Sequence, residues 1–331
     1  MRYAVLGCKA HKFANNQGKK SLRDLLPEES QVRMKWISAH AKQFKVQRMT
    51  ELLEVSKSGF YRHLKRSPGK RSRENSFLVA KVKEVYEQGR KCYGSPRITA
   101  SLRQQGYSVG HNRVARIMRE NNLKAKMKRK RVKTTDSSHS RPVAENILNR
   151  QFQVSEMNRV WAGDIAMLSP SVSPAGNGCR SYIPTREGWL YLAIVLDLHS
   201  RKVVGWSMSQ TMETELVIGA ISMALQRRNT ELGLLFHSDR GSQYASQSFQ
   251  EYLTGYGMAQ SMSRRGNCYD NACSESFFGT LKLECCDRVF ESRKEASSTI
   301  FEYIEVFYNR QRLHSTLGYL SPEQFEQRNV A

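Results

Sequence analysis

The chain has 331 residues, with 53 Lys and Arg against 30 Asp and Glu. The positive charge is concentrated in residues 1–150, which contain 36 Lys and Arg but only 11 Asp and Glu. No run approaches the roughly 18 apolar residues of a membrane span, no secretory signal is evident, and the seven cysteines form no CxxC pair, so we expect no membrane, secreted or zinc-binding protein. Reduced thiols in the cytoplasm and a polyanionic partner are expected instead, because each neutralised phosphate releases condensed counterions. A basic protein of the ribosomal type is the alternative before any motif is considered.

The first predicted elements follow a basic, poorly patterned segment over residues 1–33, to which no role is assigned. VQRMTELL (46–53) places its apolar residues on one face, and the short break EVS separates it from KSGFYRHLKR (57–66). Helix, tight turn and helix are typical of a helix-turn-helix, with Lys57 and Arg62 as candidate DNA contacts. Any small helical hairpin would show the same outline.

A second helical group is predicted over residues 74–123. It begins with a long helix over 74–89, whose apolar stripe is Phe77, Val79, Val82, Val85 and Tyr86. The next helix has Ser95 as its N-cap and Pro96 at its first position, and Gly106 ends it.

The last helix of this group has the sequence HNRVARIMRENN. Its apolar residues lie on one face and its arginines on the opposite face, so Arg113 and Arg116 are candidate DNA contacts. The inward-facing residues are Val114, Ile117 and Met118. A second helix-turn-helix with a basic recognition helix is favoured, and a solvated charged helix is the alternative.

A dense basic run, KAKMKRKRVK (124–133), follows the helices. It predicts a linker over 124–148 that contacts phosphates, although a plain flexible tether would look the same. The candidate contacts in it are Lys128, Arg129, Lys130 and Arg131. The chain is thereby divided into a helical DNA-binding region over 34–123, this linker, and a catalytic region over 149–331.

From about residue 149 the sequence indicates an α/β domain. Three runs rich in β-branched and aromatic residues predict strands, and these are RVWAGDIAML, LYLAIVLDLHS and KVVGWSMS. ETELVIGAISMALQRR predicts an amphipathic helix, GLLFHSD a fourth strand and SFQEYLTGYG a helix. Further helices are predicted in YDNACSESFFGTLKLECC and from about residue 293 to residue 312.

Three acidic residues stand at positions that favour catalysis. Asp164 lies inside the first predicted strand, Asp239 at the end of the fourth, and Glu275 on the helix that follows. Groups at the carboxyl ends of strands converge on one edge of an open α/β sheet. Carboxylates brought together repel one another, and a divalent metal relieves this repulsion. Mg²⁺ with hard oxygen ligands suits such a set, and two ions can support an in-line phosphoryl displacement.

The spacing of these acids is informative. Asp239 and Glu275 are separated by 35 residues, and Lys282 comes seven residues after Glu275. Seven residues are close to two helical turns, so Lys282 shares a helix face with Glu275. A cation beside a metal-binding carboxylate is suited to holding a DNA phosphate.

On these motifs the chain resembles the transposases of bacterial insertion sequences of the insertion-sequence-three family, in particular the product of the second reading frame. The resemblance runs from about residue 36 to residue 325. The strings that carry it are CYGSPRITASLRQQGYSVGHNRVARIMRENNLKAK, VWAGDI, YIPTREGWLYLAIVLDLHSRKVVGW, FHSDRGSQY, GNCYDNACSESFFGTLKLE and YNRQRLHSTLGYLSPEQF.

The resemblance implies an Asp-Asp-Glu transposase. Asp164, Asp239 and Glu275 fall on the family's catalytic positions, and Lys282 on its following basic residue. The implied fold is a ribonuclease-H-like integrase core, a mixed five-stranded sheet with flanking helices. The implied reaction is hydrolytic nicking that frees a 3′-OH, followed by attack of that 3′-OH on a phosphodiester, with no covalent protein–DNA intermediate.

The same resemblance implies the cofactor and the partners. Two Mg²⁺ ions are expected, held by the three carboxylates in pairs, and Mn²⁺ is expected to substitute. The expected partners are the terminal repeats of the element, target DNA, further copies of the chain, and a first-frame protein, since this sequence has no heptad run of its own. The resemblance also implies that the protein is located in the bacterial cytoplasm and associated with the nucleoid.

Two other functions fit parts of the sequence. A DNA-binding regulator with a decayed nuclease domain would share the helical region, and a structure-specific or RNA–DNA-hybrid nuclease would share the carboxylates.

The sequence also supports three local expectations. Asp197 shapes a hairpin turn, His237 packs or orients its neighbours, and residues 167–181 form a passive surface loop between two strands.

Overall fold

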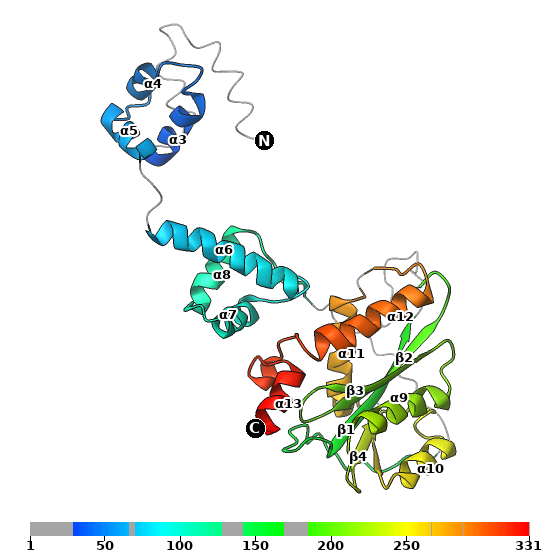
Figure 1. The fold of residues 1–331 in the computed structure, drawn as a ribbon. Coiled ribbons are helices and arrows are strands. Elements are labelled where there is room, and N and C mark those ends of the chain that lie inside the picture. The colour runs from blue at the N-terminus through cyan, green and yellow to red at the C-terminus, as the bar shows by residue number, and fades with distance from the viewer. Residues whose placement is uncertain are drawn as a thin grey trace. The chain divides into compact units, whose positions relative to one another are not determined.

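The computed structural model describes residues 29–65, 70–127, 142–168, 185–265, 267–286 and 288–330 (Figure 1). The chain forms two compact units, of which the first ends at Leu78 and the second begins at Val79. The predicted basic contacts Lys128, Arg129, Lys130 and Arg131 lie outside the described residues. No helix within these ranges is long and apolar enough to cross a membrane.

The first unit contains the predicted helical hairpin. Helices α3 (Ser30–His40), α4 (Val46–Leu52) and α5 (Lys57–Lys65) enclose a small core. The buried residues of this core are Ile37, Met49, Leu53, Val55 and Phe60. The candidate DNA contacts Lys57 and Arg62 are exposed on α5.

Helices α6 (Lys70–Gln88), α7 (Ser95–Gln104) and α8 (His111–Glu120) form the second helical group. Their buried side chains are Leu78, Val82, Val85, Tyr86, Ile98, Leu102, Val114, Ile117 and Met118. Two expectations were wrong in detail. Phe77 is 54% exposed, because the buried face of α6 uses Leu78 instead. Gly94, not Ser95, is the N-cap of α7, and the Ser95 hydroxyl lies 2.9 Å from Nε2 of His111.

The second unit is built on a mixed five-stranded sheet with the order β3-β2-β1-β4-β5. Strands β1 (Val160–Leu168), β2 (Leu190–Asp197) and β3 (Val203–Ser209) pair antiparallel, whereas β4 (Leu235–Ser238) and β5 (Ala259–Met262) run parallel to β1. This confirms the expected sheet. The short strand β5 had no pattern of its own in the sequence.

Helices cover both faces of this sheet. Helices α9 (Thr214–Arg227) and α10 (Gln247–Gly255) pack on one face. Helices α11 (Ala272–Glu284) and α12 (Arg293–Glu302), with the π-helix η2 (Tyr303–Tyr308), pack on the other. The predicted helix over 293–312 is therefore divided between α12 and η2 and ends earlier than expected, at Tyr308.

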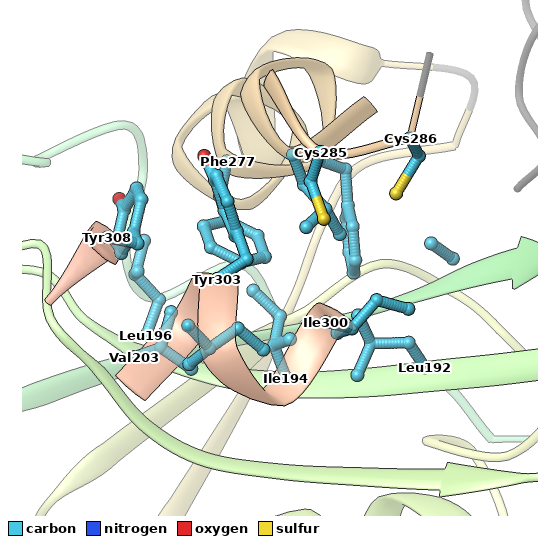
Figure 2. Close-up of a cluster of buried hydrophobic side chains, with 14 of the residues drawn as sticks. Leu192, Ile194, Leu196, Val203, Phe277, Cys285, Cys286, Ile300, Tyr303 and Tyr308 are labelled. Atoms are coloured by element: carbon cyan, nitrogen blue, oxygen red, sulfur yellow. The ribbon is translucent and has the colours of Figure 1, made fainter. Parts of the chain in front are cut away.

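Strand β2 shows how the two cores are separated. Its side chains alternate, so that Leu192, Ile194 and Leu196 enter the core beneath α11 and η2, while Ala193 and Val195 enter the opposite core. Figure 2 shows the first of these cores, where strand residues meet Phe277 and Cys285 of α11 and Tyr303 and Tyr308 of η2. This packing fixes the height of α11 above the sheet.

Two turns bear on the sequence predictions. Asp197 is buried, and its carboxylate accepts hydrogen bonds from the backbone N–H groups of Asn158, His199 and Ser200, which confirms its role in shaping the turn. The predicted loop 167–181 begins later than expected, because β1 continues to Leu168. The remainder of that loop lies outside the described residues.

Candidate active site

The parallel pairing of β1 and β4 brings Asp164 and Asp239 to the same level of the sheet. Ala162 of β1 pairs with His237 of β4. Asp164 comes two residues after Ala162 on β1, and Asp239 comes two residues after His237, just beyond the end of β4. Asp164 has the same parity as Ala162 and Ala166, so it points to the sheet face that α11 covers. The expected convergence at the carboxyl end of β4 is thus a consequence of strand register.

Both aspartates have one carboxylate oxygen held by backbone. The N–H of Ile165 donates to Oδ1 of Asp164 at 2.9 Å, and the N–H of Gly241 donates to Oδ1 of Asp239 at 2.9 Å. These contacts fix the orientation of each carboxylate.

The pKa of Asp164 places the predicted residues in one electrostatic site. Burial raises this pKa well above its usual value, and the negative charges of Asp239 and Glu275 raise it further. The hydrogen bond from Ile165 and the positive charge of Lys282 act in the opposite direction. Asp239, Glu275 and Lys282, the other residues that the sequence selected, therefore all lie within electrostatic range of Asp164.

Helix α11 supplies Glu275 and Lys282. Both are half-buried and lie seven residues apart, which places them on one face of the helix. The first turn of α11 lies beside β1, where Nδ2 of Asn271 is 3.5 Å from the carbonyl oxygen of Gly163, the residue before Asp164. The approach of this helix to β1 brings Glu275 within electrostatic range of Asp164.

Buried polar contacts fix the loop between β5 and α11. Nε2 of His237 lies 3.0 Å from the carbonyl oxygen of Asp270, and Nδ1 lies 2.9 Å from the hydroxyl of Ser261. Because a carbonyl oxygen only accepts, Nε2 carries the proton and Nδ1 accepts. Burial lowers the pKa of His237 to about 4, so the ring is neutral. These contacts support the orienting role predicted for His237.

Three polar residues stand just before α11, and only one of them caps a helix through its side chain. Asn267 does cap the 3-10 helix η1 (Cys268–Asn271), since its side chain accepts from the N–H of Tyr269 at 3.1 Å. Asn271 makes no such cap contact, and Asp270 binds arginines instead. Sequence reasoning could not find the contact with Arg150, because it joins residues 120 positions apart in the chain.

The three carboxylates suit Mg²⁺ ions that are each bound by two of them, and do not suit a single ion bound by all three. In the described ranges no three or more His, Cys, Asp or Glu side chains, the predicted triad included, form a group that could hold one metal ion. Mg²⁺ is commonly bound by one or two carboxylates, with water and substrate phosphate completing its shell. Oδ1 of Asn271, whose Nδ2 lies beside the carbonyl oxygen of Gly163, is buried without a hydrogen-bond partner, and a metal-bound water would satisfy it.

The hydroxyl groups near the carboxylates differ in accessibility. Tyr244 is buried, and its pKa is raised well above the usual value by burial and then by the charges of Asp164 and Asp239. Ser238 is also buried and donates to the carbonyl oxygen of Asp239. Both are therefore poor nucleophiles. Tyr269, in contrast, is 70% exposed on η1.

A mixed sheet with carboxylates beside the ends of its central strands defines the integrase-core class. Residues 154–268 and 275–330 match two families described as Integrase core domain, and residues 72–131 match the HTH-like domain family. The fold is therefore the integrase core expected from the sequence, a mixed five-stranded sheet with flanking helices, preceded by an HTH-like region over residues 72–131.

Relatives identify the family more closely. The chain is 42% identical over 301 residues to the transposase InsF for insertion sequence IS3A of Escherichia coli K12, covering 89% of this chain and 99% of that protein. It is 41% identical over 281 residues to a 31 kDa protein of insertion element IS600 from Shigella sonnei, covering 85% and 98%. The chain belongs to the IS3 family of transposases.

Solved structures resemble the chain only distantly. The HTLV-2 integrase catalytic core domain in complex with magnesium, in its dimeric form, is 18% identical and covers 52% of this chain and 97% of that one, with a TM-score of 0.36.

Proposed function

We propose that the chain is a DNA transposase that nicks the ends of its element to free a 3′-OH and then transfers that end to target DNA by direct phosphoryl transfer. The observation that carries the proposal is the shared level of Asp164 and Asp239 on parallel neighbours, with Glu275 brought to them by α11. The relative InsF supports it, because that protein is named a transposase.

Divalent metal, bound by pairs of these carboxylates, would activate the attacking oxygen and neutralise the charge that develops on the leaving oxygen. Mg²⁺ is proposed, with Mn²⁺ as a substitute. The chain's own residues hold the geometry. Backbone amides orient Asp164 and Asp239, and the helix face that carries Glu275 also presents Lys282 toward a DNA phosphate.

The helical regions are proposed to bind the element's ends. Arg116 is exposed on α8, Arg113 is half-buried there, and Lys57 and Arg62 are exposed on α5. Each second helix of a helix-turn-helix is the one that enters the major groove, so these basic residues lie where DNA is expected. A further copy of the chain and a first-frame protein are proposed as partners on the DNA.

A cleavage assay tests the function directly. The full chain is incubated with a duplex carrying the end of its own element, in the presence of Mg²⁺, Mn²⁺ or a chelator, with and without the first-frame protein. We expect a nick at the 3′ end of the element and joined products in either metal, and neither product with the chelator. DNA binding without any cleavage would instead favour the decayed regulator, and equal cleavage of unrelated branched or hybrid substrates would favour the structure-specific nuclease.

A further inference from the structure

Tyr269 is the most exposed aromatic side chain among the described residues, at 70%. The backbone of Tyr269 is held in η1, because its N–H donates a hydrogen bond to the side chain of Asn267 at 3.1 Å. A large ring held outward in this way leaves apolar surface in water, which favours a partner for it.

The neighbour of Tyr269 is a buried carboxylate that gathers two arginines. Nε of Arg150 donates to Oδ1 of Asp270 at 2.7 Å, and the backbone N–H of Arg264 donates to Oδ2 at 3.0 Å. Nε of Arg264 lies 3.4 Å from the same oxygen. Burial alone would raise the pKa of Asp270, but the hydrogen bonds and charges of these arginines outweigh it and lower the pKa.

Both arginine side chains remain about half exposed, whereas the carboxylate between them is fully buried. The guanidinium group of Arg150 also lies over the ring of Tyr269, 5.8 Å from its centroid. One carboxylate faces two arginines, so the surface around the tyrosine ring has excess positive charge. An aromatic ring bordered by oriented guanidinium groups is the pattern that binds single-stranded nucleic acid, through stacking and phosphate contacts.

This surface adjoins the catalytic carboxylates. The carbonyl oxygen of Asp270 lies 3.0 Å from Nε2 of His237, two residues before Asp239. The next residue, Asn271, contacts Gly163 beside Asp164, and Glu275 follows one helical turn later. DNA whose phosphodiester reaches the carboxylates must therefore pass close to Tyr269.

We propose that Tyr269, Arg150 and Arg264 form a strand-end site, in which the tyrosine ring stacks on an unpaired base next to the reacting phosphodiester and the arginines bind the flanking phosphates. This proposal rests on the proposed function, because it assigns the DNA strand to the active site. The ring acts through stacking rather than as a nucleophile, so its hydroxyl is dispensable.

The test uses a short duplex with two unpaired nucleotides at one end, the outer of which is the fluorescent base 2-aminopurine. Binding by the full chain is measured with a chelator present, so that no cleavage occurs. Stacking on Tyr269 quenches the fluorescence. We expect quenching by the unchanged chain and by Tyr269→Phe. Tyr269→Ala should show no quenching and roughly tenfold weaker binding, in line with the effect of removing one stacking ring.

Matched variants separate a local effect from a general one. Tyr256→Ala removes another exposed tyrosine, which is 52% exposed at the end of α10, and is expected to leave both readouts unchanged. A fully paired blunt duplex is expected to bind Tyr269→Ala and the unchanged chain equally. Quenching by Tyr269→Ala, or an equal loss of affinity for the blunt duplex, would overturn the strand-end site.

The two proposals fail in different ways. A chain that cleaves its element's ends in Mg²⁺ but shows no difference between Tyr269→Ala and Tyr269→Phe refutes the strand-end site alone. A chain that quenches the base through Tyr269 but never cleaves refutes the catalytic proposal and retains the strand-end site.

Discussion

Arg312 donates two parallel hydrogen bonds to Glu284, from Nε to Oε2 at 2.8 Å and from Nη2 to Oε1 at 2.9 Å. The side chains are only 4% and 1% exposed, and the hydroxyl of Tyr303 donates to the same carboxylate at 2.9 Å. Burial alone would lower the pKa of Arg312, but Glu284 outweighs it and raises the pKa above its ordinary value. Glu284 is the last residue of α11, so this pair ties the helix that carries Glu275 to the carboxy-terminal segment.

Breaking this pair should destabilise the second unit. Arg312→Met leaves the carboxylate of Glu284 buried without its cation, and the free energy of unfolding is expected to fall by about 3–5 kcal/mol. Replacing both partners, with Glu284→Leu added, should recover much of that loss, since no uncompensated charge remains. Urea unfolding of the full-length variants measures both. A double variant no more stable than Arg312→Met alone would show that the pair matters through packing rather than charge.

The carboxylates should be needed for chemistry but not for DNA binding. Asp239→Asn, Asp164→Asn and Glu275→Gln keep the side-chain shape and remove one negative oxygen each, so metal binding fails while the DNA contacts made elsewhere survive. We expect nicking and strand transfer to be lost and the affinity for element ends to change little. Gel-shift and cleavage assays on the same preparations measure the two properties. Parallel loss of binding and cleavage would contradict these assignments.

Asp164→Asn should also stabilise the metal-free fold at neutral pH. The raised pKa of Asp164 means that the folded chain binds this proton more tightly than the unfolded chain does. The stabilisation by that proton is present in acid and is lost as the pH rises through the folded-state pKa. The variant should therefore have the higher melting temperature at neutral pH, with little difference below about pH 4, near the ordinary carboxyl pKa.

Thermal unfolding with a chelator checks this, and added Mg²⁺ should raise the melting temperature of the unchanged chain more than that of the variant. Equal melting temperatures at every pH would mean that neither burial nor the neighbouring carboxylates raise the pKa of Asp164 in the folded chain.

The arginines of α8 should contribute to DNA affinity through phosphate contacts. Removing Arg113 and Arg116 together is expected to weaken binding and to lower the slope of log affinity against log salt by roughly 0.9 for each lost contact. A matched control removes Arg159 and Arg186, which lie within the integrase-core matches and, like Arg116, pair with acidic side chains. Fluorescence anisotropy over a salt series compares the two. An equal change of slope in both pairs would assign the effect to net charge alone.

Local patterns predicted most of this fold, and long-range pairs account for what they missed. Runs rich in β-branched and aromatic residues were sufficient for β1, β2 and β3, and the 35-residue spacing between Asp239 and Glu275, with the family resemblance, selected the carboxylates. Strand β5 has the sequence AQSM, too short and polar for any periodicity, and forms because β4 offers it a parallel partner. The contacts of Asp270 with Arg150 and of Glu284 with Arg312 depend on tertiary packing, which no local pattern encodes.

The last prediction concerns the loop between β1 and β2. Residues 169–181 include four Ser, two Pro and two Gly, a composition that supplies no core, and only Arg180 is charged. The variant to be tested lacks residues 169–181. The deletion begins at 169 because Met167 and Leu168 are paired with Tyr191 and Leu190. It ends at 181 so that Thr185, which bridges to Phe290, keeps its place. Eight residues then remain between Leu168 and Leu190, enough to close a hairpin whose ends are already paired.

We expect this deletion to leave the melting temperature and Mg²⁺-dependent nicking largely unchanged, because it keeps the register that sets the position of Asp164. A matched deletion that also removes Met167 and Leu168 should lower the melting temperature, since two strand pairs are lost. Nicking slowed by more than about tenfold in the shorter deletion, a barrier change near 1.4 kcal/mol, with an unaltered melting temperature would show that the loop takes part in the reaction.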